Sequence, residues 1–128
     1  MEVQRATRYP LHGRAQVALP SQTIVAGHTV DISEGGVCLL LNDRISVPAP
    51  CTIRFEMCIK GQVHIITAQV KSVYGVFASQ GGFRAGFEFK DSDQNRTALI
   101  KSLAGKKPMV ESASIKTAAP ILGSDFLA

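Results

Sequence analysis

Apolar and polar residues alternate along two stretches of this chain, and that alternation limits what the chain can fold into. From Cys51 to Ile59 every odd-numbered residue is apolar, and the residues between them are mostly polar. The same alternation runs from Phe83 to Phe89. A period of two is typical of β-strands with one buried face. The chain is therefore predicted to build a sheet whose core lies on one side.

Turn residues divide the rest of the chain into strands of similar length, and this spacing predicts a sandwich or a small barrel. Closure into a barrel leaves no bare sheet edge, so we favour a barrel. The stretch from Gln62 to Tyr74 is long for one strand and is expected to bend or bulge. The six predicted strands are Arg14–Leu19, Thr23–Ile32, Val37–Leu41, Cys51–Ile59, Gln62–Tyr74 and Phe83–Phe89.

One helix is predicted after the last strand. Asp91 and Gln94 have the spacing of a capping box, and Gly105 is suited to end the helix. Its apolar side would pack on an end or a side of the barrel. That side comprises Leu99, Ile100 and Leu103, with Arg96 and Lys101 elsewhere. The predicted fold is thus all-β with one helix: a six-stranded antiparallel β-barrel plus a C-terminal α-helix.

The length of 128 residues fits one domain. We expect that domain to cover residues 1–105, including an N-terminal basic arm at 1–13, and residues 106–128 to form a loosely ordered tail. No apolar run approaches the ~20 residues of a membrane span, and the N-terminus lacks the apolar segment of a signal peptide. These features predict a cytoplasmic protein without membrane insertion.

Positive charge is concentrated at the N-terminus. Residues 1–14 hold three arginines against one glutamate, a net charge of +2, whereas the whole chain carries +4. Arginine binds phosphate groups and base edges in a bidentate way that lysine cannot match. The arm is therefore either a solvated basic segment or an anion-binding one.

Catalytic motifs are absent from the sequence, and we expect no enzymatic activity. The three cysteines have no CxxC spacing and the three histidines no ligand spacing, so no metal site or cofactor is predicted. Reduced thiols suit a cytosolic protein. A catalytic pair formed by Cys58 and His64 stays open, although nothing in the sequence orients it.

The turn from Asp31 to Gly36 has two interpretations. In the structural one, Asp31 and Ser33 cap the turn and two glycines supply positive φ angles. In the functional one, the Asp31 carboxylate accepts hydrogen bonds from a guanine, Ser33 donates to an oxygen, and the glycines admit a ligand. The arginines of the arm would then bind phosphate or guanine O6 and N7.

Taken in order, the arm Gln4–Pro10 and the turn Asp31–Gly36 resemble the two motifs of the PilZ domain, a bacterial receptor module for cyclic di-GMP. Those motifs are RxxxR and [DN]xSxxG, and the turn matches the second one fully. The stretch Arg84–Phe89 resembles the closing strand of the family, and the helix after it also fits. The resemblance covers roughly residues 4–104.

The resemblance implies a set of ligand-binding residues, with one departure. Arg8 aligns with the second motif arginine, so Gln4 stands where the first is expected, and Arg5 matches an additional arginine of many members. Losing one charged hydrogen bond would weaken binding by about ten- to a hundredfold, unless Arg5 or Arg14 compensates. The implied site comprises Gln4, Arg5, Arg8, Asp31, Ser33, Gly35 and Gly36.

The implied function is that of a cyclic di-GMP receptor that passes the signal to an unidentified effector protein. An arm that is mobile without ligand would close over the nucleotide at the barrel mouth. Two alternatives remain: a PilZ-like adaptor in pilus or motility assembly that binds no nucleotide, which Gln4 favours, and a small barrel that binds single-stranded nucleic acid. The aromatic content of 6% disfavours the last, because few aromatic platforms are left for bases. Those platforms are Tyr9, Tyr74 and Phe77, whereas Phe55, Phe83, Phe87 and Phe89 fall on core positions.

Overall fold

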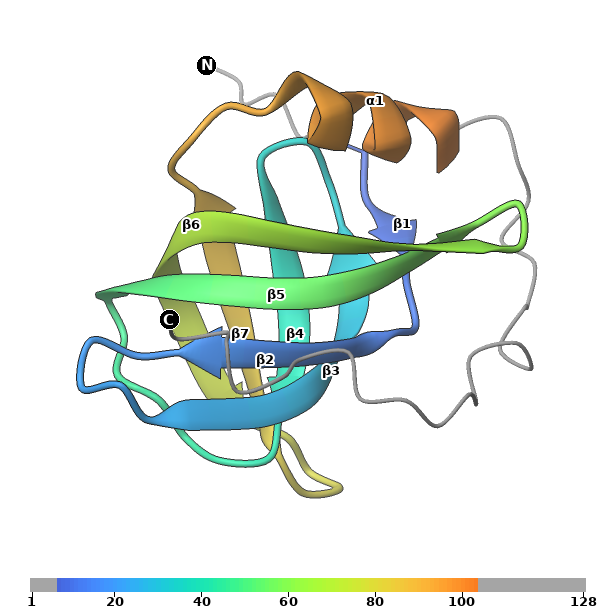
Figure 1. Ribbon diagram of the computed structural model, residues 1–128. Helices are drawn as coiled ribbons and strands as arrows, with labels where there is room; N and C mark the ends of the chain where they lie inside the picture. Colours follow the sequence, from blue (N-terminus) through green and yellow to red (C-terminus); the bar gives the residue numbers. More distant parts are fainter. Residues whose placement is uncertain (1–6, 104–128) are drawn as a thin grey trace, which may run out of the picture.

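The computed structural model describes residues 7–103 as a closed antiparallel β-barrel with one helix over one end (Figure 1). The predictions that Gly105 ends the helix and that residues 106–128 form a tail lie outside the described residues. All six predicted strands are found, each within three residues of the expected bounds. The elements are β1 (Tyr9–Pro10), β2 (Arg14–Ala18), β3 (Ile24–Ile32), β4 (Gly36–Leu41), β5 (Ala49–Ile59), β6 (Gln62–Phe77), β7 (Phe83–Phe89) and α1 (Gln94–Ser102).

The barrel closes because β3 pairs on both of its edges. Around the barrel the order is β3, β2, β5, β6, β7 and β4, and β4 returns to β3. The two-residue strand β1 was not predicted. It pairs with the far end of β3, beyond the stretch that pairs with β2.

The core fills the inside of the barrel, as the period of two predicted. Phe55 and Ile53 of β5 are fully buried. Phe83 and Phe87 of β7 are also buried, and Phe89 is half-buried against the core. Each fully buried side chain of this size contributes about 1.5–3 kcal/mol relative to its exposed state.

The start of the helix differs from the prediction. Asp93, not Asp91, is the N-cap residue, and its carboxylate accepts a hydrogen bond from the Arg96 backbone N–H at 3.0 Å. Asp91 instead accepts one from the Arg96 guanidinium at 3.1 Å. Both aspartates precede the helix, so spacing alone could not decide between them.

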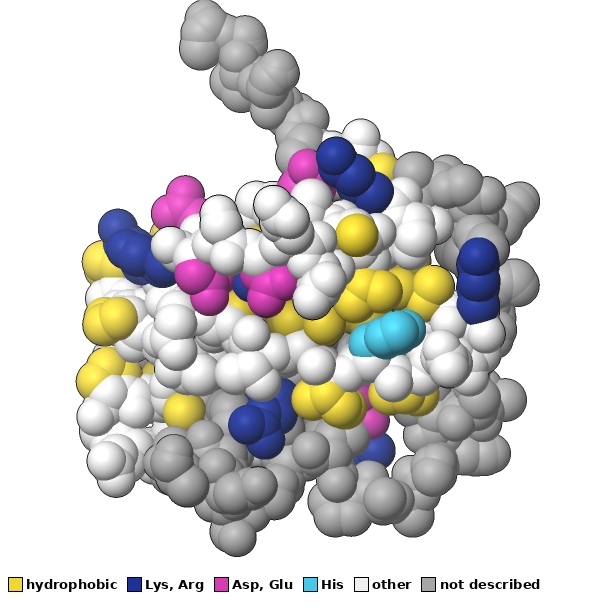
Figure 2. All heavy atoms as spheres, turned by 45° about the horizontal axis from the view of Figure 1, so that its top comes forward, with side chains coloured by type: hydrophobic (Ala, Val, Ile, Leu, Met, Phe, Trp, Pro, Cys, Tyr) yellow, Lys and Arg dark blue, Asp and Glu magenta, His cyan; other side chains and the backbone are white. Residues whose placement is uncertain are grey.

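Arg96 was expected away from the packed side of the helix, and that expectation was wrong. Its side chain is only 4% exposed, and its guanidinium lies 4.1 Å from the centre of the Phe89 ring. Together with the buried Ile100, it fixes α1 over the end of the barrel. Figure 2 looks onto this end, where apolar side chains are visible along the helix. Among residues 7–103, no helix is long and apolar enough to cross a membrane.

Candidate functional site

The N-terminal arm is guided to the motif turn by its pairing with β3. Pro10 lies opposite Asp31 and Tyr9 opposite Ile32, and the Leu11 N–H donates to the Val30 carbonyl at 3.0 Å. This register brings Arg8 beside Asp31, where its Nε donates to Oδ1 at 2.9 Å. The two side chains are 47% and 28% exposed, so both keep free hydrogen-bonding atoms at the surface.

A β-bulge turns Asp31 outward. Thr29 lies opposite Leu39 and Asp31 lies opposite Cys38, so β3 advances two residues while β4 advances one. Thr29 and Leu39 are both buried, and strict alternation would have buried Asp31 as well. The extra residue reverses the alternation, which places Ile32 in the core and Asp31 on the outer face of the barrel.

A second bulge does the same for Tyr74 on the other side of this face. Ser72 lies opposite Phe87 and Tyr74 lies opposite Gly86, with a register shift between them. Ser72 is buried, whereas Tyr74 is 45% exposed. The bulge expected in this long strand is thus confirmed, and it moves an aromatic side chain to the outer surface.

The two bulged residues share one row across four strands. Asp31 pairs with Cys38, Cys38 pairs with Gly86, and Gly86 pairs with Tyr74. We call these four residues the outer row. The Tyr74 ring covers Gly86, where any side chain would collide with it, and its hydroxyl donates to Cys38 Sγ at 3.6 Å. The ring therefore leans back toward Asp31.

The charged side chains around this row act on the pKa values of Cys38 and Tyr74. Burial is the main cause that raises the pKa of the Cys38 thiol, and Asp31 raises it further. The pKa of Cys38 is lowered by its hydrogen bond with Tyr74 and by the charges of Arg84 and Arg8. Burial also raises the pKa of Tyr74, assisted by Cys38 and Asp31. Tyr74 and Arg84 were not predicted as site residues, because only the strand register brings them next to Asp31.

Ser33 holds the motif turn together from inside. It is 3% exposed, its hydroxyl donates to the Gly36 carbonyl at 3.4 Å, and the Gly35 N–H donates to its oxygen at 3.3 Å. The Ser33 N–H donates to the same Gly36 carbonyl at 2.8 Å. Ser33 thus shapes the turn that carries Asp31, and its hydroxyl proton is already used in this structure.

The motif glycines do not supply positive φ angles, so that part of the structural interpretation was wrong. Among residues 7–103, the glycines with φ in the left-handed region are Gly61, Gly81 and Gly82. Gly36 is required for another reason: a side chain there would collide with the carbonyl of Phe87 on β7. Gly35 is exposed and has open space around it.

Two predicted site residues and one candidate to compensate for Gln4 remain to be placed. Gln4 and Arg5 lie outside the described residues. Arg14 cannot compensate for Gln4, because its guanidinium is held by the buried Glu56 at 2.9 Å. Glu56 also accepts from the Arg14 backbone N–H at 3.1 Å.

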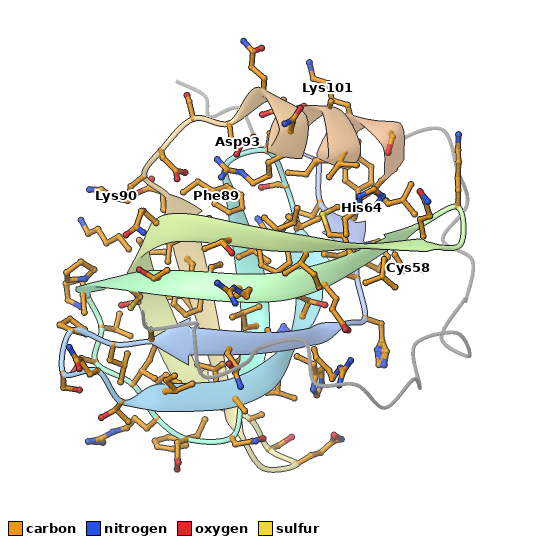
Figure 3. All side chains as sticks on the ribbon, in the orientation of Figure 1. Cys58, His64, Phe89, Lys90, Asp93 and Lys101 are labelled. Carbon is orange, nitrogen blue, oxygen red and sulfur yellow. The ribbon has the colours of Figure 1, made fainter. Side chains whose placement is uncertain are left out.

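The structure argues against the open Cys58–His64 pair. Cys58 lies opposite Val63, and His64 lies opposite Met57. Neighbouring positions of a strand point to opposite faces, so the thiol and the imidazole lie on different sides of the β5–β6 hairpin (Figure 3). Within residues 7–103, no three His, Cys, Asp or Glu side chains are grouped as a metal site requires.

Comparison with protein families identifies this fold and its motifs. The family model described as the PilZ domain matches residues 2–105. The chain belongs to the PilZ domain family. The match includes the arm, the motif turn and the helix, which confirms the resemblance seen in the sequence. Comparison with curated proteins gives no match.

Solved PilZ structures share the fold. The inhibitor of motility MotI from Bacillus subtilis is similar with a TM-score of 0.67 and 10% identity, over 84% of this chain and 55% of that one. YcgR from Escherichia coli in complex with cyclic di-GMP gives 0.65 and 16%, over 79% and 44%. The chain thus spans about half the length of these two proteins. The isolated PilZ domain of YcgR with cyclic di-GMP gives 0.58 and 14%, over 80% and 88%.

Proposed function

We propose that this PilZ domain is a receptor for cyclic di-GMP and that the nucleotide binds on the outer row beside the N-terminal arm. The observation that carries the proposal is the ion pair between Arg8 and Asp31. It joins the arm motif to the turn motif on one exposed face of the barrel. Structures of family members with cyclic di-GMP support the choice of ligand.

Asp31 would select guanine. One carboxylate oxygen accepts from Arg8, which leaves the other to accept from the N1–H and the exocyclic amine of a base. Adenine has no donor at N1, so the carboxylate would disfavour it by leaving a charged acceptor unpaired. Arg8 uses Nε on Asp31, and its two terminal nitrogens remain to bind a phosphate or guanine O6 and N7.

Tyr74 would provide the stacking surface for the base. The inner face of its ring covers Gly86, and 45% of the residue is exposed. Because its hydroxyl reaches Cys38, which pairs with Asp31, a guanine on the ring would have its edge within reach of the carboxylate. Arg5 and Gln4 would approach from the arm.

Binding would be transmitted to a partner protein. The ligand would draw residues of the arm onto the outer row and thereby change the charge and shape of that face. A ligand shifts such an equilibrium only by the difference in its affinity for the two arrangements. The effector is therefore proposed to recognise the face formed by the arm, the ligand and the exposed end of β6.

Isothermal titration with cyclic di-GMP tests the receptor function, with GTP and cyclic di-AMP as controls. Micromolar or tighter binding of cyclic di-GMP alone supports the proposal, and the stoichiometry distinguishes one bound nucleotide from two. Absence of binding would favour the alternative that Gln4 suggests, an adaptor that acts through protein contacts without nucleotide.

A further inference from the structure

The charge that Gln4 lacks has a candidate arginine replacement on the described surface. Arg14 is excluded because Glu56 holds it. Arg84 lies on the outer face of β7, two residues before Gly86 of the outer row. Two residues of a strand correspond to about 7 Å, a distance that an arginine side chain lying along the strand can cover.

Arg84 is available to bind an anion. It is exposed, and within residues 7–103 it makes no ion pair and no side-chain hydrogen bond. Its neighbours on the flanking strands are apolar: Leu40 on β4 and Val76 on β6. A guanidinium is more weakly hydrated than an ammonium group, so Arg84 loses less hydration on binding a phosphate than a lysine would.

The charges along β7 set a direction for the ligand. Glu88 lies on the same face as Arg84, two residues beyond Gly86 on the opposite side of the outer row, between Gly36 on β4 and Lys71 on β6. That side therefore carries one charge of each sign, whereas the side of Arg84 carries only a positive one, so a phosphate is attracted toward Arg84. Arg84 and Arg8 both act to lower the pKa of the Cys38 thiol. This shared effect supports the view that the two guanidiniums lie near the same part of the surface.

We propose that Arg84 binds a phosphodiester group of the cyclic dinucleotide and replaces the charge that the first motif arginine would supply. This inference rests on the proposed function. In this arrangement the phosphate lies on the Arg84 side of the outer row, and the base lies against Asp31 and Tyr74. Arg8 contacts both the phosphate and the base.

The test measures the affinity for cyclic di-GMP of the wild-type chain and of Arg84→Gln. A lost charge-assisted bond predicts weakening of about ten- to a hundredfold. Arg54→Gln is the matched control: it removes the same charge from β5, which pairs with neither β4 nor β7, and its affinity should stay within about twofold. Circular dichroism confirms that each variant is folded.

A rescue variant separates binding from a structural effect. Gln4→Arg restores the motif arginine, and adding it to Arg84→Gln should recover most of the lost affinity if the two positions supply the same charge. Arg84→Gln with wild-type affinity, or without any recovery from Gln4→Arg, would overturn this inference while the receptor function stands. A wild-type chain that does not bind cyclic di-GMP would overturn the receptor function itself, and this inference with it.

Discussion

Arg8 Nε lies 2.9 Å from Asp31 Oδ1, across 23 positions of sequence. This contact is made by the short pairing of β1 with β3, so the barrel itself places one motif residue against the other. In the proposed site, each of the two residues orients its partner for the ligand. Because both are partly exposed, the pair contributes about 0–1 kcal/mol to folding, and the role proposed for it is in ligand binding.

Arg8→Ala and Asp31→Ala should each weaken cyclic di-GMP binding by about 1–3 kcal/mol, because each removes a charged hydrogen-bonding group. Their unfolding free energies should stay within about 1 kcal/mol of wild type. Residues in contact are not additive, so the double variant should lose less affinity than the sum of the two. Titration calorimetry and urea unfolding measure both quantities. Wild-type affinity in both single variants would refute this site.

Tyr74→Ala should lose about 1–3 kcal/mol of binding free energy, the usual contribution of a base stacked on an aromatic ring. Tyr74→Phe keeps the ring and loses only the hydroxyl that reaches Cys38, so its affinity should remain close to wild type. Isothermal titration with cyclic di-GMP distinguishes the two variants. Equal losses in both would mean that the hydroxyl, not the ring, contacts the ligand.

The sequence predicts the six barrel strands because alternation follows directly from one-sided burial. It does not predict β1, since two residues cannot show a period and their pairing depends on β3. Arg96 was misjudged for a similar reason. Its burial follows from Asp91 and the Phe89 ring, which meet it only after the helix has packed.

The candidate site is predicted only in part. The motif residues Arg8, Asp31 and Ser33 are recognisable from the resemblance, but Tyr74 is not. The sequence named Tyr74 only as a possible exposed platform for single-stranded nucleic acid, and the bulge after Ser72 is what places it in the same row as Asp31. Arg84 needs the same register to lie beside the outer row. Bulges depend on tertiary pairing, and a local pattern does not locate them.

Gly36→Ala and Gly35→Ala should differ in stability although the glycines are neighbours in one motif. A methyl group at Gly36 would collide with the Phe87 carbonyl and force β4 from β7, at a cost of about 1–3 kcal/mol. Gly35 has open space and no left-handed φ, so its variant should unfold within about 0.5 kcal/mol of wild type. Urea unfolding provides the comparison. Equal stability of the two variants would contradict the close approach of β7 to Gly36.

Alkaline pH should destabilise the barrel through Cys38, Cys51 and Tyr74. Burial raises the pKa of both thiols above the ordinary 9.0, and burial with the Cys38 contact raises the pKa of Tyr74 above 10.0. These groups hold their protons more tightly in the folded protein than in the unfolded one. Their contribution to the free energy of unfolding is therefore complete below pH 9 and is lost as the pH rises through the folded pKa values.

The free energy of unfolding should therefore be level up to about pH 9 and decline above it, as urea unfolding at successive pH values would show. Cys38→Ala and Cys51→Ala should each flatten this decline, whatever they do to stability at neutral pH. Cys58→Ala is the matched control, because that thiol lies on the outer face of the β5–β6 hairpin and is only half-buried. A decline that persists unchanged in both Cys38→Ala and Cys51→Ala would assign the alkaline transition to other groups.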